Sequence, residues 1–367
     1  MKYLKIVFSI LFINFLFGQT PVGDQFQVNT SFNLGQRNAS VAVNKDGNFV
    51  AVWQSNHSGE YNIYGQRFDS DGNQVGSEFL VNTTTDLEQS YPSVAIDSLG
   101  AFIVVWQTLD STGADWEIYG QLYDASGNTV GSEFHVNTET YRYQLYPQVA
   151  MDRDGNFTVV WQSLASGVGI FMQQYDYLGN PVGVETQVNT YTNRENSEPQ
   201  IAMNPNGQFA VAWQANYSSP DISARAFTAS GVGLGDQIVV NQYTTNYQTK
   251  ANVDIDDSGN FIVVWQSDGQ DGSGLGVYGR RFDNAMNAIG NDFVLSTTTD
   301  SIQRAPDVVL DNNGEVTAFW EGYDASSMTL DVYYKRFDDA NGVLVDETLL
   351  STEQSGNQGN VSVGKNS

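Results

Sequence analysis

The segment Val-Ala-Val-Asn-Lys-Asp-Gly-Asn-Phe-Val-Ala-Val-Trp at residues 41–53 recurs five more times in related form, and each copy ends in tryptophan. These tryptophans follow one another at intervals of 52 to 55 residues. A fixed period of this length is typical of repeat architectures, in which neighbouring units cover each other's apolar faces. We therefore predict one domain of similar units. The residues expected to hold the units together are Trp53, Trp106, Trp161, Trp213, Trp265 and Trp320.

Short apolar runs separated by turn signals divide each unit into strands. In the first unit, apolar runs lie on either side of the turn at residues 45–48 and of the turn at residues 69–73. Asp-Gly between two apolar runs is a strong hairpin signal, because glycine adopts positive φ without steric cost. Each unit is therefore expected to form four antiparallel strands.

The second strand of each unit is apolar on both faces, as in Phe-Val-Ala-Val-Trp at residues 49–53. Because alternate side chains of a strand point to opposite faces, such a sheet has to be covered on both sides. Neighbouring sheets in a ring provide that cover. We predict an all-β fold, a β-propeller of four-stranded antiparallel blades.

Six blades account for most of the chain, and the propeller domain is expected to span residues 19–367. Residues 25–30 match the fourth strand of a unit and residues 360–364 match the first strand, and both lie outside the six complete repeats. The alternative is therefore a ring of seven blades, one of them incomplete. The repeats run over residues 38–91, 92–146, 147–198, 199–250, 251–305 and 306–351.

The N-terminus has the pattern of a secretory signal peptide. Lys2 and Lys5 precede an apolar run at residues 6–17, and Gly18 follows it. This run is too short for a spanning helix, so we predict a signal peptide at residues 1–18 and a secreted or cell-surface protein, with a retained membrane anchor as the alternative. No later apolar stretch is long enough to span a bilayer, and the chain has no cysteine.

The net charge of the chain limits the classes of molecule that it can bind. A formal net charge of −26 repels phosphate backbones, so nucleic acid is not expected as a partner. Polysaccharide or another surface protein is the expected partner, and the chain is expected to be a monomer. No cofactor is predicted, and the one metal considered is calcium. Its candidate ligands are acidic residues in turns and loops, although ordinary turn chemistry also explains them: Asp69, Asp71, Asp152, Asp154, Asp268 and Asp271.

The repeat also resembles a known pattern. The run Asp-Gly-Asn-Phe-x-Val-x-Trp-Gln-Ser, followed by Ile-Tyr-Gly-Gln-Arg-Phe-Asp and then by Gly-Ser-Glu-Phe-x-Val-Asn-Thr, resembles a repeat of large exported bacterial surface proteins of poorly defined function. The resemblance covers nearly the whole mature chain. It implies a propeller and export, and it implies no catalytic residues.

Aromatic residues are frequent in the connections that join the second and third strands and in those that join successive units. Both kinds of connection are expected at one rim of the ring. Exposed aromatic rings suit stacking on sugar faces or packing on a protein partner, and covering the ends of the sheets is the alternative role. The candidate ligand-binding residues are Tyr61, Trp116, Tyr141, Tyr143, Tyr146, Tyr217, Tyr247 and Tyr323.

Three functions remain open. The preferred hypothesis is an exported, non-catalytic binding or adhesion module, which is not an enzyme and has no catalytic residues. The first alternative is a propeller glycosidase or lyase with carboxylates on the variable rim. The second is a structural segment of a larger adhesin. Glycoside hydrolysis needs two placed carboxylates, and no such pair stands out in the sequence.

Overall fold

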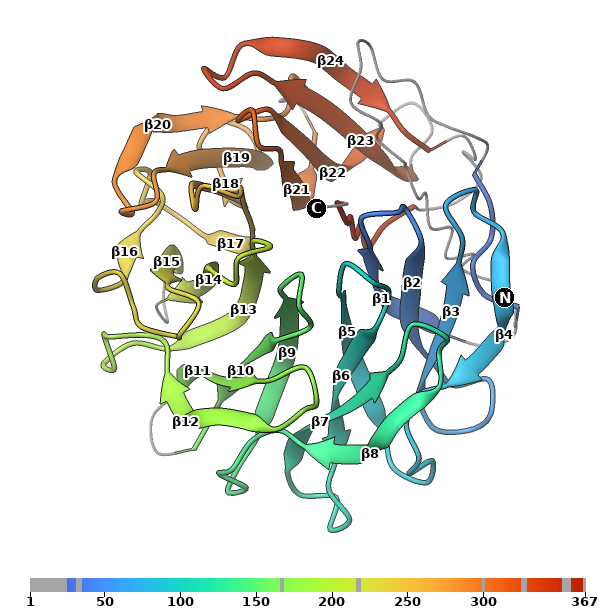
Figure 1. The fold of residues 1–367 in the computed structure, drawn as a ribbon. Helices are drawn as coiled ribbons and strands as arrows, with labels where there is room; N and C mark the ends of the chain where they lie inside the picture. Colours follow the sequence, from blue (N-terminus) through green and yellow to red (C-terminus); the bar gives the residue numbers. More distant parts are fainter. Residues whose placement is uncertain are drawn as a thin grey trace.

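The computed structural model describes residues 25–30, 35–165, 168–215, 219–298, 301–324, 329–351 and 358–365. The expected signal peptide at residues 1–18 and the candidate Tyr217 lie outside these ranges. Six four-stranded antiparallel sheets surround a central axis (Figure 1). The prediction of an all-β propeller with six complete four-stranded blades is confirmed. Within the described ranges, no helix has the length and apolar character needed to cross a membrane.

Each blade is a meander in which the chain moves outward from the axis. The first strands line the axis, and they are β1 (Gln36–Val43), β5 (Gln89–Ile96), β9 (Gln144–Met151), β13 (Asn196–Met203), β17 (Gln248–Ile255) and β21 (Gln303–Leu310). The second strands are β2 (Phe49–Ser55), β6 (Phe102–Leu109), β10 (Phe157–Ser163), β14 (Phe209–Ala215), β18 (Phe261–Asp268) and β22 (Val316–Asp324).

The outer half of each blade contains the third and fourth strands. The third strands are β3 (Asn62–Phe68), β7 (Trp116–Tyr123), β11 (Gly169–Tyr175), β15 (Asp221–Phe227), β19 (Leu275–Phe282) and β23 (Thr329–Phe337). The fourth strands are β4 (Gln74–Leu80), β8 (Thr129–His135), β12 (Pro181–Gln187), β16 (Ile238–Val239), β20 (Ala288–Val294) and β24 (Val343–Leu349). Consecutive strands pair throughout, so each sheet has the order first, second, third, fourth.

This strand order puts two kinds of connection at each end of the ring. The connections between second and third strands and those between successive blades emerge at one end, which we call the upper face. The turns between first and second strands and between third and fourth strands emerge at the other end, which we call the lower face.

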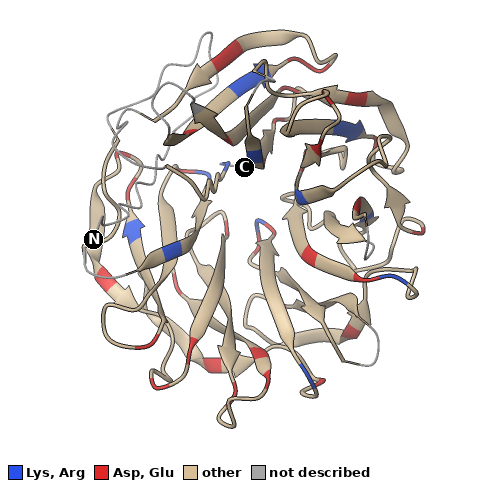
Figure 2. Cartoon of the chain, turned by 180° about the vertical axis from the view of Figure 1, so that it is seen from behind, with Lys and Arg blue, Asp and Glu red and all other residues tan. Residues whose placement is uncertain are grey.

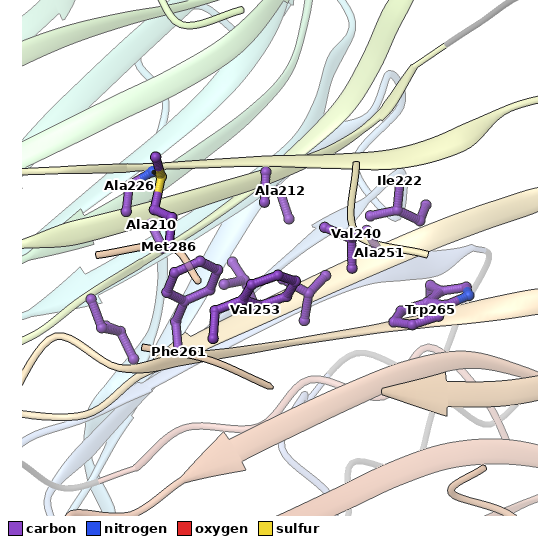
Figure 3. Close-up of a cluster of buried hydrophobic side chains, with 14 of the residues drawn as sticks. Ala210, Ala212, Ile222, Ala226, Val240, Ala251, Val253, Phe261, Trp265 and Met286 are labelled. Carbon is purple, nitrogen blue, oxygen red and sulfur yellow. Dashed lines mark hydrogen bonds between the residues drawn. The ribbon is translucent and has the colours of Figure 1, made fainter. Parts of the chain in front are cut away.

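The core lies between the blades and not within any one of them. Figure 3 shows one such interface, where Ala212 of blade 4 faces Val253 and Trp265 of blade 5. The six repeat tryptophans are at most 1% exposed and lie in these interfaces. Fully burying one large apolar side chain stabilises the fold by roughly 1.5–3 kcal/mol, so a blade depends on its neighbours for stability.

The C-terminal segment at residues 358–365 lies on the axis between β21 and β1 (Figure 1). The backbone N–H of Val363 donates to Asp307 in β21 at 2.8 Å, and Ser362 Oγ accepts from the N–H of Val41 in β1 at 3.3 Å. A bond of the same kind joins neighbouring first strands elsewhere, as from Val94 N–H to Ser40 Oγ at 3.2 Å. The segment thus takes the place of a seventh first strand.

The N-terminal segment at residues 25–30 takes the place of a seventh fourth strand. Thr30 donates its N–H to Glu78 Oε2 at 2.8 Å, as Thr83 donates to Glu133 Oε2 at 2.7 Å between the next two blades. Phe26 packs on Phe68 with 5.6 Å between the ring centroids. The two segments that the sequence places outside the six repeats therefore lie where the first and fourth strands of a seventh blade would lie.

Candidate active site

Every first strand contains a bulge near its upper end. The pairing of first and second strands shifts register there, for example between Arg37 and Ser40 in β1. One residue in each bulge has a positive φ of 48° to 54°, although none of these residues is glycine, and Asn360 of the C-terminal segment has a φ of 59°. Bulges of this kind re-aim side chains and are frequent beside active sites. We call these seven positions the mouth ring: Asn38, Tyr91, Tyr146, Glu198, Lys250, Ala305 and Asn360.

The backbone of the mouth ring is held in the same way in blades 2, 3 and 6. Gln54 Oε1 accepts from the N–H of Tyr91 at 3.0 Å, and Gln107 Oε1 accepts from the N–H of Tyr146 at 2.9 Å. Asn360 is the mouth-ring residue of the C-terminal segment. Its backbone N–H donates to the carboxylate of Glu321, where blades 2, 3 and 6 use a glutamine. The main chain therefore repeats around the ring, whereas the side chains at this position differ from blade to blade.

Four consecutive mouth-ring side chains form two pairs, one aromatic and one ionic. The rings of Tyr91 and Tyr146 meet edge to face, with 4.9 Å between their centroids. Lys250 Nζ lies 2.7 Å from Glu198 Oε2. Burial raises the pKa of Tyr146, and the neighbouring Tyr91 and the charge of Glu198 raise this pKa further. Tyr146 consequently holds its phenolic proton at neutral pH.

Two arginines precede mouth-ring residues directly. The Arg37 guanidinium lies 4.3 Å from the ring centroid of Tyr61 and hydrogen-bonds its hydroxyl. Arg304 Nε donates to Glu321 Oε2 at 2.8 Å. Both arginines are exposed, whereas the Glu321 carboxylate is buried. Exposed cations thus stand at this end of the axis, although acidic residues are distributed around the whole ring (Figure 2).

The aromatic residues predicted from the sequence lie at the upper face wherever they are described, but they do not form one cluster. Tyr146 belongs to the mouth ring, and Tyr61 lies against Arg37. Trp116 opens β7, and Tyr323 lies near the end of β22. The others stand exposed in connections between blades, at 64% for Tyr141, 42% for Tyr143 and 54% for Tyr247.

Glu198 and Lys250 are not among the residues predicted from the sequence. A signal for them is nevertheless present, because each lies two residues after the glutamine or asparagine that opens the first strand. That position reads Asn, Tyr, Tyr, Glu, Lys, Ala and Asn around the ring. A structural position would repeat, so variation at a fixed point of the repeat marks a candidate site.

The acidic residues considered as calcium ligands lie at both ends of the ring. Asp69 Oδ1 accepts from the N–H groups of Asp71 and Asn73 in its own lower-face turn, and these bonds to Asn73 lower its pKa. Asp152 accepts in the same way from Asp154 and Asn156. Asp268 ends β18 at the upper face, and Asp271 lies in the connection that follows it. The described residues contain no group of three or more acidic, histidine or cysteine side chains arranged to hold a metal ion.

Several solved structures share the propeller fold of this chain. No family model and no curated protein matches the sequence. A polysaccharide lyase, ulvan lyase, is similar with a TM-score of 0.59 and 12% identity, over 85% of this chain and 84% of the lyase. An α-L-arabinofuranosidase of Fusarium graminearum is similar with a TM-score of 0.54 and 12% identity, over 83% of this chain and 93% of that one.

A sialidase of Streptococcus pneumoniae is also similar, with a TM-score of 0.54 and 8% identity over 85% of this chain and 68% of the sialidase. At such identities the likeness establishes the fold alone. It still corrects the preferred hypothesis from the sequence: the similar structures with named activities are enzymes that act on glycans, and they lend no support to a non-catalytic adhesion module. The expectation that the chain is not an enzyme is corrected on the same grounds. The propeller glycosidase or lyase is the better-supported alternative.

Proposed function

We propose that this chain is an enzyme that cleaves glycosidic bonds of a polysaccharide at the mouth ring. The observation that carries the proposal is the break in the repeat at Tyr91, Tyr146, Glu198 and Lys250. A shared backbone geometry there presents a phenol, a carboxylate and an ammonium group in mutual contact or close range. An extracellular enzyme of this kind fits the signal peptide expected at residues 1–18.

Tyr146 and Glu198 are the proposed reacting groups. Tyr146 is protonated at neutral pH, so it can give a proton to the leaving glycosidic oxygen. Glu198 can accept the other proton, and its carboxylate lies 2.7 Å from Lys250 Nζ. In hydrolysis that proton comes from the water whose oxygen bonds to the anomeric carbon. In elimination it comes from the carbon beside a uronate carboxylate, as a carbon–carbon double bond forms.

The shared fold supports the proposal. One similar propeller is named as a polysaccharide lyase and is also known bound to a saccharide, and others are named as a sialidase and as an arabinofuranosidase. Propellers offer the first strands around one axis, so residues from several blades can meet at one substrate. The mouth ring uses this geometry, since its connected residues come from blades 2, 3, 4 and 5.

The test is a cleavage assay of the purified chain on a panel of polysaccharides. New reducing ends report any cleavage, and ultraviolet absorbance of unsaturated sugars reports elimination only. Tyr146→Phe and Glu198→Gln should each lower the rate about 100-fold or more, because positioned acid–base groups contribute that much. Tyr177→Phe and Asp154→Asn are matched controls on exposed lower-face turns and should leave the rate unchanged.

Two outcomes would overturn the proposal. One is the absence of new reducing ends on every polysaccharide of a broad acidic and neutral panel. The other is cleavage that persists at the wild-type rate in both Tyr146→Phe and Glu198→Gln, since the reacting groups would then lie elsewhere. Circular dichroism of each variant establishes that its fold is retained.

A further inference from the structure

The mouth-ring residues and the residues directly before them form two chemically different arcs. Going around the axis in chain order, Tyr91, Tyr146 and Glu198 come from blades 2, 3 and 4. Cationic residues come from blades 5, 6 and 1, and the C-terminal segment lies between the last two. We call these the aromatic arc and the cationic arc. The cationic arc contains Lys250, Arg304 and Arg37.

The charge of the cationic arc is opposite to that of the chain. The mouth-ring residues, the residues directly before them and Glu321, which accepts from Arg304 and Asn360, carry three positive and two negative charges, on a chain whose formal net charge is −26. Acidic residues of the same face, such as Glu60, Glu88 and Glu139, belong to the connections between strands. A confined patch of this sign attracts an anionic ligand to the axis, because its field acts at short range.

The cations of the arc are exposed to solvent, although Lys250 pairs with Glu198 and Arg304 pairs with Glu321. Lys250 is 53% exposed at its side chain and Arg304 is 44% exposed. By contrast, Arg225, Arg280 and Arg281 donate to backbone carbonyls of neighbouring segments and hold the blades in place. Arg37 lies over the Tyr61 ring and makes no ion pair among the described residues.

We propose that the substrate is an anionic polysaccharide, whose carboxylate or sulfate groups bind the cationic arc while a sugar ring packs on the aromatic arc. This inference rests on the proposed function and names the substrate class for the same site. The planar guanidinium of Arg37 matches two oxygens of a carboxylate or sulfate group. Tyr91 and Tyr146 offer apolar ring surface with a hydroxyl at its edge, which suits a pyranose.

The experiment measures binding and cleavage of polygalacturonate and of the same polymer after chemical reduction of its carboxyl groups. κ-Carrageenan, which carries sulfate but no carboxylate, and neutral agarose form a second pair. The full chain should bind one or both anionic polymers and bind the neutral partner of each at least tenfold more weakly. The pair that shows the difference identifies the anionic group.

Arg37→Gln and Lys250→Gln should each weaken binding of the anionic polymer roughly 3- to 10-fold and reduce its salt dependence, as expected for exposed ionic contacts. Lys45→Gln is the matched control, because Lys45 is an exposed cation of a lower-face turn. It should leave binding unchanged. Arg304 is not substituted, because Glu321 would lose its partner and the fold would suffer.

The outcomes separate this inference from the proposed function. If the chain cleaves neutral polymers and binds them as tightly as their anionic counterparts or more tightly, the proposal of an anionic substrate is wrong. The proposal of an enzyme would still hold. Binding that depends on Arg37 and Lys250, without cleavage of any polymer, would support the anionic ligand and overturn the enzyme. If Lys45→Gln weakens binding as much as Arg37→Gln and Lys250→Gln do, the effect is one of net charge. The proposal that the cationic arc binds the ligand would then be wrong.

Discussion

The backbone N–H of Val363 donates to Oδ2 of Asp307 at 2.8 Å, and this bond joins the C-terminal segment to the first strand of blade 6. Asp307 is buried, and its Oδ1 accepts from Asn252 Nδ2 at 2.7 Å in blade 5. One carboxylate therefore links three consecutive inner strands. Next to it, Lys365 Nζ lies 2.8 Å from Asp254 Oδ2.

Removing this carboxylate should weaken the whole ring. In Asp307→Ala the N–H groups of Val363, Val308 and Asn252 lose their acceptor, and unsatisfied buried donors are costly. We expect the free energy of unfolding to fall by about 2–4 kcal/mol, measured by chemical denaturation. Asp154→Ala, in an exposed turn, is the control and should change it by less than about 0.5 kcal/mol. A loss in Asp307→Ala no larger than in the control would contradict the linking role.

The same carboxylate should make stability depend on pH. Burial raises the pKa of Asp307 to about 7 from an ordinary value of 3.8, although bonds from Val363 and Val308 oppose the shift. The folded chain thus holds this proton more tightly than the unfolded chain. Its stabilising contribution is complete below about pH 3.8 and declines as the pH rises to about 7.

The measurement compares wild type with Asp307→Asn across that range. In the wild type, the Asp307 contribution to the free energy of unfolding should fall by up to about 1.4 kcal/mol per pH unit, and the neutral amide should lack this slope. The ion pair of Asp254 with Lys365 is present in both proteins, and the charge of Asp254 contributes to the raised pKa of Asp307. Parallel pH profiles of the two proteins would rule out the shift.

Much of the fold could be predicted from the sequence, because the same pattern occurs in each repeat and so can be compared between units. The tryptophan register, the Asp-Gly turns and the doubly apolar second strand together require a ring of sheets. The positions of residues 25–30 and 358–365 are harder to predict from the sequence. They depend on hydrogen bonds to Glu78, Asp307 and Val41, which lie far from these segments in the chain.

The candidate site was harder to predict than the fold. Exposed tyrosines in long connections attract attention in a sequence, yet Tyr141 and Tyr247 contact no mouth-ring residue by any bond that the structure shows. Glu198 lies in β13 and Lys250 in β17, and the sequence of each strand suggests a structural role only. Only the bulge, created by pairing between first and second strands, brings them together at 2.7 Å. Such a shift in register is a property of the pair of strands and not of either segment alone.

Repeat positions with the same residue should differ in energy where their bonds differ. Gln89 Oε1 accepts from Trp106 Nε1 at 2.9 Å and from Thr108 Oγ1 at 2.6 Å. Gln303 occupies the same place in blade 6, but its Oε1 and Trp320 Nε1 are both buried without a hydrogen-bond partner. Gln89→Ala should therefore lower the free energy of unfolding by about 2–3 kcal/mol.

Gln303→Ala should cost clearly less than Gln89→Ala, by about 1 kcal/mol or more, because it breaks no bond to the tryptophan. The two variants are matched in volume lost and in burial, so the difference reports the hydrogen bonds. Trp320 fluorescence cannot be separated from that of the other tryptophans, so denaturation followed by circular dichroism is the suitable measurement. Equal losses would mean that the Gln89 bonds contribute nothing beyond packing.

Arg281 and Arg67 provide a similar contrast at the repeat position just before the last aromatic residue of the third strand. Arg281 is 6% exposed and donates to Gly314 O at 2.6 Å, Asp338 O at 2.7 Å and Asn341 Oδ1 at 2.6 Å. It thereby joins blade 5 to two lower-face turns of blade 6. Burial lowers the pKa of Arg281, and the nearby acids Asp339, Asp338 and Asp311 oppose that shift, so the guanidinium stays charged.

Arg67 makes only one such bond, to Ala125 O at 3.3 Å, and lies in a more exposed place. Arg281→Ala should lower the free energy of unfolding by about 3 kcal/mol, because three partly buried acceptors lose a charged donor, whereas Arg67→Ala should cost less than about 1 kcal/mol. Arg281→Lys should recover only part of the loss, since an ammonium group cannot reproduce the planar fork that reaches both turns. Full recovery by lysine would show that the charge alone, and not the geometry of the guanidinium, joins the two blades.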